Sequence, residues 1–167
     1  MVYFGDFEGG AEDAIRRGDF YVQNIIGNQF GLEPFYRGIS LYAMWRKTGE
    51  KKYKKAAREV RKQYQIWVKK GCVNLVGLLQ LFDAEEQAMA KKQSTACKKF
   101  IEAIRILLAS GFYSNAGVAC ERYSTYLAEI GDAAESRNQL EQARAHYDRW
   151  GAKKKVELLL DQLTKLR

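Results

Sequence analysis

Apolar residues recur every three or four positions along most of the chain, which places them on one face of successive helices. The clearest case is residues 50–70, where one face carries Tyr53, Ala57, Val60, Tyr64 and Trp67. The same periodicity predicts helices at 6–26, 34–48, 74–89, 94–109, 114–130 and 132–150, and a last helix with Leu159, Leu160, Leu163 and Leu166. We therefore expect eight helices, or four hairpins, and no strands. Trp67 and Trp150 are expected to anchor the core, and Ile101 is expected to face inward. The expected helix N-caps are Asn74, Ser94, Ser114 and Asp132.

A short pattern repeats in the last third of the chain. A glycine follows an alanine by eight positions at Ala103 and Gly111 and again, 40 residues later, at Ala143 and Gly151, with Gly131 midway between the two glycines. Glycine commonly ends helices, and a hairpin buries its apolar stripe only against its neighbours. The fold class predicted is all-α, a right-handed stack of about four antiparallel helix hairpins that forms a single domain over residues 1–167.

Composition fits one intracellular helical domain. Of 167 residues, 47% are hydrophobic and 13% aromatic, which is enough to fill a core. No stretch of 18 apolar residues exists and the first residues lack a signal-peptide pattern, so we expect no membrane span and a cytoplasmic location. Cys72, Cys97 and Cys120 lack the spacing of a zinc site or disulfide framework, so we expect free thiols, with Cys97 and Cys120 buried.

Two stretches carry a resemblance to a known family. They are "SNAGVACERYSTYLAEIGD" and "QARAHYDRWGAKKKVELL", and "FGDFEGGAEDAIRRGD" and "FYRGISLYAMWRKTGEKKYKKAA" extend the likeness more loosely. The chain resembles the tetratricopeptide-like region at the C-terminal side of large signal-transduction ATPases of the AAA/STAND type and of associated kinase and cyclase proteins. The resemblance implies an α-solenoid that serves as an interaction or sensing module in a signalling assembly.

No catalytic motif accompanies that resemblance. A phosphate-binding loop of the form G-x-x-x-x-G-K-[ST] and the kinase lysine and aspartate set are both missing, so we expect no enzyme activity and no cofactor. The only histidine, His146, cannot form a multi-histidine metal site, and no metal is expected. Asp83, Glu85 and Glu86 are interpreted as salt-bridge partners of the neighbouring lysine-rich helix.

Positive charge is concentrated between residues 46 and 70. This stretch has eleven lysines and arginines and two glutamates, a net charge of +9, whereas the whole chain is +8. The candidate partner-binding residues on the predicted polar face are Lys51, Lys54, Lys55, Arg58 and Lys62. Four interpretations stay open: a solvated helix face, or a surface that attracts an acidic protein, nucleic acid or an anionic membrane. Nucleic acid is less favoured because the aromatic residues of this helix lie on the predicted buried face.

Arg122 and Tyr126 form a second candidate. They are four residues apart and share a helix face, so in the groove of a helical stack they would hold a peptide carboxylate or a phosphate. The alternative is a structural ion pair, for example between Glu121 and a nearby arginine.

The C-terminal leucines suggest a further alternative. No polar capping helix follows them, which favours self-association through the C-terminal helix or a structural subunit packed permanently in a larger complex.

Overall fold

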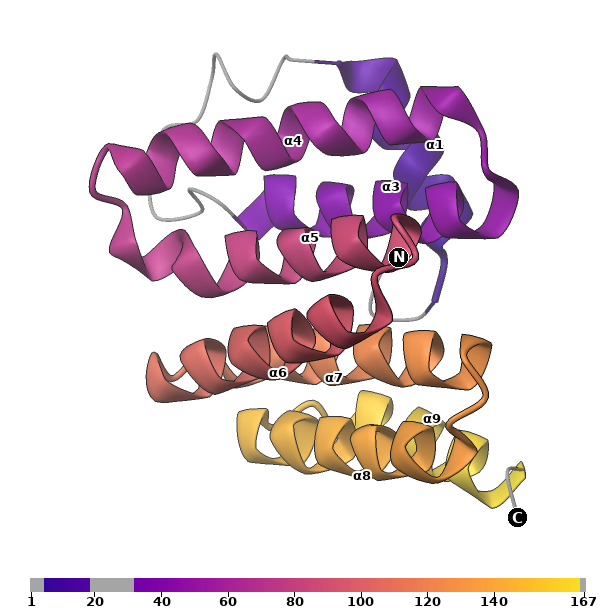
Figure 1. Ribbon diagram of the computed structural model, residues 1–167. Coiled ribbons are helices and arrows are strands. Elements are labelled where there is room, and N and C mark those ends of the chain that lie inside the picture. Colours follow the sequence, from indigo (N-terminus) through magenta and orange to yellow (C-terminus); the bar gives the residue numbers. More distant parts are fainter. Residues whose placement is uncertain (1–4, 19–31, 166–167) are drawn as a thin grey trace. The chain divides into compact units, whose positions relative to one another are not determined.

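The computed structural model describes residues 5–18 and 32–165, and these form helices joined by short turns (Figure 1). The helices are α1 (Phe7–Arg17), α3 (Leu32–Thr48), α4 (Lys51–Lys69), α5 (Val76–Met89), α6 (Gln93–Ala109), α7 (Tyr113–Glu129), α8 (Ala133–Trp150) and α9 (Lys153–Lys165), with a 3₁₀ turn, η2 (Val73–Leu75), before α5. Within these two ranges there are eight α-helices and no strands, as the periodicity predicts. Residues 19–26 of the first predicted helix, and Leu166, lie outside the described residues.

The chain divides into two compact units, Met1–Phe82 and Asp83–Arg167. In the first unit, α1 packs against α3 and α4, and the chain turns at Gly49 so that α4 returns along α3 (Figure 1). In the second unit, α6 packs on α7, α7 on α8 and α8 on α9. In the first unit α1, α3 and α4, and in the second unit α6 to α9, therefore pack on their neighbours along the chain.

The core of the first unit is centred on Phe82. Its ring centroid lies 5.9 Å from that of Phe35, 5.6 Å from Tyr42 and 5.0 Å from Tyr64. A Cβ atom at Gly38 would lie 2.5 Å from the tip of the Phe82 ring, closer than packed atoms come. The glycine therefore lets the backbone of α3 lie directly against this aromatic cluster.

The buried face of α4 is the one that the sequence predicts. Tyr53, Ala57, Val60, Tyr64 and Trp67 are all 9% exposed or less, and Tyr64 is fully buried. Because these five side chains occupy the inner face, the lysines and arginines at the other positions point outward or lie at its edges.

In the second unit, α7 is the most deeply buried helix. Its Tyr123 and Tyr126 rings stack on Phe100 of α6, with centroids 5.1 and 5.7 Å apart. On another side of α7, a Cβ at Gly117 would lie 2.7 Å from the ring of Tyr147 in α8. Small residues of α7 thus let aromatic side chains of its neighbours approach its backbone.

Three residues predicted to be buried are exposed. Ile101 is 55% exposed, Trp150 51% and Leu160 45%. Ile101 and Leu160 each follow a buried residue directly, which turns them by about 100° from the buried stripe. Trp150 is the last residue of α8, at the edge of the stripe that contains Tyr147. The expectation that Trp150 anchors the core is therefore wrong, whereas Trp67 is buried as predicted.

The helix starts were predicted less well than the buried faces. Asp132 caps α8 as expected, because its carboxylate accepts a hydrogen bond from the Glu135 N–H at 3.1 Å. Ser94 and Ser114, predicted to be N-caps, lie inside α6 and α7, which begin one residue earlier. Asn74, also predicted to be a cap, lies within η2.

Helix ends recur every 20 residues from position 71 onward. Gly71, Lys91, Gly111, Gly131 and Gly151 all have positive φ angles, between 57° and 97°. The glycine pattern of the last third thus extends back to Gly71, with Lys91 in the place of a glycine. A lysine in this left-handed conformation is strained because its Cβ approaches the following carbonyl oxygen.

Substituting this lysine tests the turn geometry. Lys91→Gly is expected to raise the free energy of unfolding by about 1 kcal/mol because glycine adopts the left-handed conformation without that strain. The reverse change at the equivalent turn, Gly111→Lys, is expected to lower it by about 1 kcal/mol. Thermal unfolding followed by circular dichroism measures both. A loss of stability in Lys91→Gly would contradict the assigned turn.

Candidate partner-binding site

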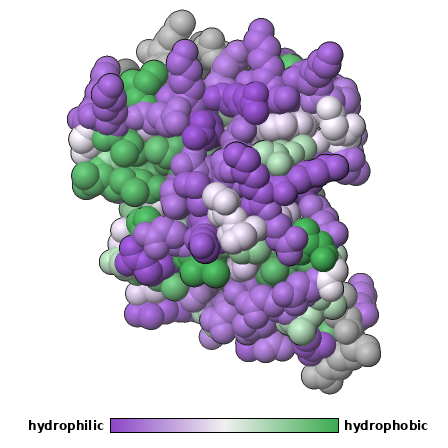
Figure 2. All heavy atoms as spheres, in the orientation of Figure 1, coloured by the Kyte–Doolittle hydropathy of each residue, from purple (hydrophilic) through white to green (hydrophobic). Residues whose placement is uncertain are grey.

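The outer face of α4 is strongly basic. Lys51, Lys55, Arg58 and Lys62 are exposed, and Lys54 is partly exposed. In the orientation of Figure 1, hydrophilic side chains project along this helix (Figure 2). All five predicted cations therefore lie where solvent can reach them, but their side chains form different contacts.

Lys54 and Arg58 lie over the ring of Trp45. The Lys54 Nζ and the Arg58 guanidinium carbon are each 5.5 Å from the ring centroid. Cations at this distance are attracted to the electron-rich face of an indole. Trp45 is only 6% exposed, so its ring is covered and offers no stacking surface to a nucleic-acid base.

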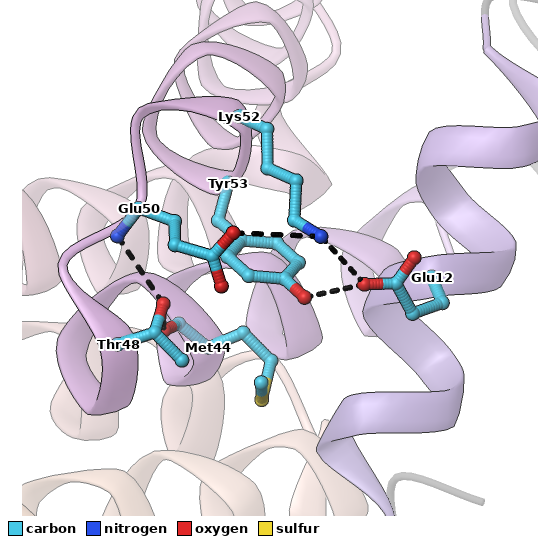
Figure 3. A network of polar contacts seen from close by, with 6 residues as sticks. All are labelled: Glu12, Met44, Thr48, Glu50, Lys52 and Tyr53. Carbon is cyan, nitrogen blue, oxygen red and sulfur yellow. Dashed lines mark hydrogen bonds and ion pairs between the residues drawn. The ribbon is translucent and has the colours of Figure 1, made fainter.

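Lys52 belongs to a network that joins α1 to the start of α4 (Figure 3). Its Nζ lies 3.0 Å from the Glu12 carboxylate and 3.5 Å from that of Glu50. The Tyr53 hydroxyl donates to the same Glu12 oxygen. These hydrogen bonds, first from Tyr53 and then from Lys52, lower the pKa of Glu12. Lys52 thus has a structural role in holding α1.

The turn beside this network is also fixed by hydrogen bonds. The Thr48 hydroxyl donates to the Met44 carbonyl at 2.9 Å and accepts from the Glu50 N–H at 3.2 Å (Figure 3). The first turn of α4 therefore has a defined position relative to α3.

Lys51, Lys55 and Lys62 remain without such partners. None of the three forms an ion pair with a carboxylate in the described parts of the chain. Lys55 and Lys62 lie on the edge of a groove of about 610 Å³ between α1, α3 and α4. A concavity of this size is within the usual range for binding sites.

The groove was not predicted from the sequence. Its apolar lining, here called the floor, consists of Ala14, Ile15, Pro34, Ala56, Val60, Ile66 and Trp67. Helical periodicity assigns Trp67 and Val60 to the buried face of α4, but it does not indicate which helices leave the flank of that face open. Ile66 lines the groove only because α1 packs where it does in the folded chain.

Arg122 and Tyr126 lie inside the second unit. Each is 4% exposed. The Arg122 Nε donates to a carboxylate oxygen of Glu85 at 2.7 Å, and the Tyr126 ring stacks on Phe100. These two residues therefore present almost no surface to a partner. The arginine forms the structural ion pair considered as the alternative, but with Glu85 in place of Glu121.

Glu121 has a different role. One of its oxygens accepts a hydrogen bond from the Tyr147 hydroxyl at 2.6 Å, and the other accepts from the Lys155 Nζ at 2.8 Å. The carboxylate thereby joins α7, α8 and α9. Residues so far apart in sequence carry no local signal of this contact.

The other residues considered from the sequence are the acidic residues Asp83 and Glu85 and the only histidine, His146. Asp83 pairs with Lys99 of α6 at 3.3 Å, and Glu85 pairs with Arg122 of α7 at 2.7 Å. The salt bridges expected between these acidic residues and the lysine-rich helix stay a prediction. In the part of the chain that the structure covers, no three histidine, cysteine or acidic residues form a metal-binding group. Burial, and then the charge of Arg149, lowers the pKa of His146.

The cysteines are free thiols of differing burial. Cys120 is buried as predicted, and its burial raises the pKa of the thiol to about 12, which keeps it protonated and poorly nucleophilic. Cys97, predicted to be buried, is partly exposed, as is Cys72.

Comparison with models of known protein families, with curated proteins and with solved structures finds no match to this chain. The likeness to tetratricopeptide-like regions therefore stays a hypothesis based on the quoted sequence stretches. Among the helices in residues 5–18 and 32–165, none is both long enough and apolar enough to cross a membrane.

The buried ion pair is testable by removing one charge. Glu85→Gln is expected to lower the free energy of unfolding by about 3–5 kcal/mol because it removes the charge of the carboxylate to which the buried Arg122 guanidinium donates. The control Glu157→Gln removes a carboxylate from an exposed pair with Lys154 and is expected to change stability by less than about 0.5 kcal/mol. Denaturant unfolding measures both. Equal effects of the two substitutions would show that Arg122 does not depend on Glu85.

Proposed function

We propose that this chain is a non-enzymatic protein-interaction or scaffolding module of a signalling assembly. In this proposal the helices form a right-handed, tetratricopeptide-like stack of about four hairpins, and the outer face of α4 binds an acidic protein partner. The signalling context follows from the sequence resemblance alone. The binding role follows from the distribution of charge on α4.

The proposal rests on those cations of α4 that form no ion pair with the described residues. These cations are Lys51, Lys55 and Lys62. Lys52, by contrast, pairs with Glu12 of α1, which lies 40 residues earlier in the chain. Like charges placed along one helix repel each other and lower stability. A bound acidic surface would relieve that repulsion, which favours a recruiting role.

An acidic protein is favoured over nucleic acid by two features of α4. Stacking on bases needs aromatic rings beside the cations, and the adjacent Trp45 is covered by Lys54 and Arg58. Glu59 is exposed among the cations, and its charge would repel a phosphate backbone. A protein surface can place a cation opposite Glu59, whereas a uniform polyanion cannot.

A structural subunit is the second candidate. Its support is the exposed apolar residues of the last two helices: Trp150 of α8 is 51% exposed, and Leu158 and Leu160 of α9 are 40% and 45% exposed. Such residues fit self-association through α9 or permanent packing against a larger complex.

Charge reversal on α4 tests the proposal. The variant with Lys51, Lys54, Lys55, Arg58 and Lys62 all replaced by glutamate is expected to lose its protein partner in affinity capture from an extract of the cells that express the chain. The loss should be at least about tenfold, since several attractive contacts become repulsive. Quantitative mass spectrometry of the captured proteins measures it, with and without nuclease.

A matched control distinguishes the effect of where the charges are reversed from the effect of the change in net charge. Reversal of Lys91, Lys92, Lys98, Lys153 and Lys165, all exposed and outside α4, also changes the net charge from +8 to −2. This control should retain the partner. Equal capture by the wild type and both variants would contradict binding by α4 and favour the apolar surface of α9, and capture abolished by nuclease would favour nucleic acid.

A further inference from the structure

The groove beside α4 combines an apolar floor with a charged edge. Ile66 belongs to the apolar lining of the groove and follows Lys62 by four residues, on the same side of α4 as the charged edge. It is 38% exposed, so an apolar side chain faces solvent there. Burying such surface against a ligand supplies favourable free energy in proportion to the area covered. The groove thus offers affinity for an apolar side chain, and its edge determines which charges can accompany it.

Two cations that line the groove are already used within the first unit. The Arg37 guanidinium donates to the Ala14 carbonyl at 3.2 Å and to the Gly18 carbonyl, so it holds the last turn of α1. Lys52 is paired with Glu12. The charges along the edge that have no ion-pair partner among the residues described are those of Lys55, Glu59 and Lys62.

These three charges alternate in sign along the edge of the groove. Lys55, Glu59 and Lys62 are separated by four and three residues, so they lie on one side of α4. At 1.5 Å per residue, Lys55 and Lys62 are about 10.5 Å apart along the helix axis, with Glu59 between them. The edge therefore presents a cation, an anion and a cation at intervals of about one helical turn.

We propose that this groove binds an acidic amphipathic helix of the partner protein, with apolar side chains on the floor and an acid, a base and an acid opposite Lys55, Glu59 and Lys62. The inference rests on the proposed function and specifies the partner's chemistry. A helix lying along α4 repeats the same rise, so its residues i, i+4 and i+7, or the reverse order, fall opposite the three charges.

An extended segment fits this edge less well than a helix. In a strand, about 10.5 Å corresponds to about three residues, and side chains three residues apart point to opposite faces. Only one of the two acidic residues of a strand would then face the lysines. The charge spacing thus favours helix-in-groove binding.

The apolar floor and the charged edge have different tasks. Exposed ion pairs contribute little affinity each, so the floor provides most of the binding and the charges determine register and partner choice. Glu59 is the selective element because it disfavours a partner that carries an acid at the central position.

The experiment uses two synthetic helical peptides and the full chain. Both peptides are about fifteen residues long and have a leucine stripe. Their flank carries glutamate, lysine and glutamate in one peptide and three glutamates in the other. Fluorescence anisotropy at about 0.15 M salt measures the dissociation constants. The wild type is expected to bind the peptide with the central lysine about fivefold more tightly, and Glu59→Lys is expected to reverse this preference.

Exposed residues elsewhere provide matched controls. Ile66→Ala in the floor should weaken binding of the preferred peptide by about fivefold to tenfold, whereas Ile101→Ala, an exposed isoleucine of α6, should leave it unchanged. Likewise, Lys98→Glu on α6 should leave the peptide preference unchanged. Circular dichroism of each variant confirms that the helices are retained.

The outcomes separate this inference from the proposed function. A preference that reverses in Glu59→Lys, together with weaker binding by Ile66→Ala, supports the groove. Equal binding of both peptides by the wild type overturns the charge register and leaves a basic docking face intact. Failure to bind either peptide overturns the groove as a helix-binding site, and the capture experiment with the charge-reversed α4 then decides independently whether this face recruits a protein.

Discussion

The packing of the Phe82 ring against α3 and α4 determines which side of α4 faces solvent. The ring contacts the aromatic side chains of Phe35, Tyr42 and Tyr64, and it lies where a side chain at residue 38 would be, so only glycine fits there. Because α4 is held by this inner face, its lysines cannot rotate inward without breaking the core. The basic surface is thus a consequence of aromatic packing on the opposite side of the same helix.

The cations of α4 differ in the contacts that they form within the first unit. Lys52 fixes α1 through Glu12, and Lys54 and Arg58 cover Trp45, so removing these charges affects structure as well as surface. Lys55 and Lys62 have no ion pair or cation–π contact with the residues that the structure describes, and they lie on the edge of an apolar groove. In the second unit, by contrast, the charges of Arg122 and Lys155 satisfy the buried or partly buried carboxylates of Glu85 and Glu121 and join helices distant in sequence.

Much of the secondary structure could be predicted from the sequence, because the buried face of a helix requires apolar residues every three or four positions. The five buried residues of α4 and the cap at Asp132 follow from such local patterns. Burial at the edges of an apolar stripe could not be predicted, as Ile101 and Trp150 show. It depends on how much of the stripe the neighbouring helices cover. The site was predicted only in part: the basic face is visible in the sequence, whereas the groove and the partner of Arg122 arise from contacts between helices far apart in the chain.

The proposed function requires that Lys55 and Lys62, which form no ion pair with the described residues, meet carboxylates of a partner. Zero-length carbodiimide cross-linking in a cell extract, with the linked peptides identified by mass spectrometry, detects this contact because it joins only lysines and carboxylates that touch. Intermolecular cross-links are expected at Lys55 and Lys62, several times more abundant than those at Lys98 and Lys153, which are also exposed. Cross-links spread evenly over all four lysines, or confined to Lys98 and Lys153, would contradict the proposed function.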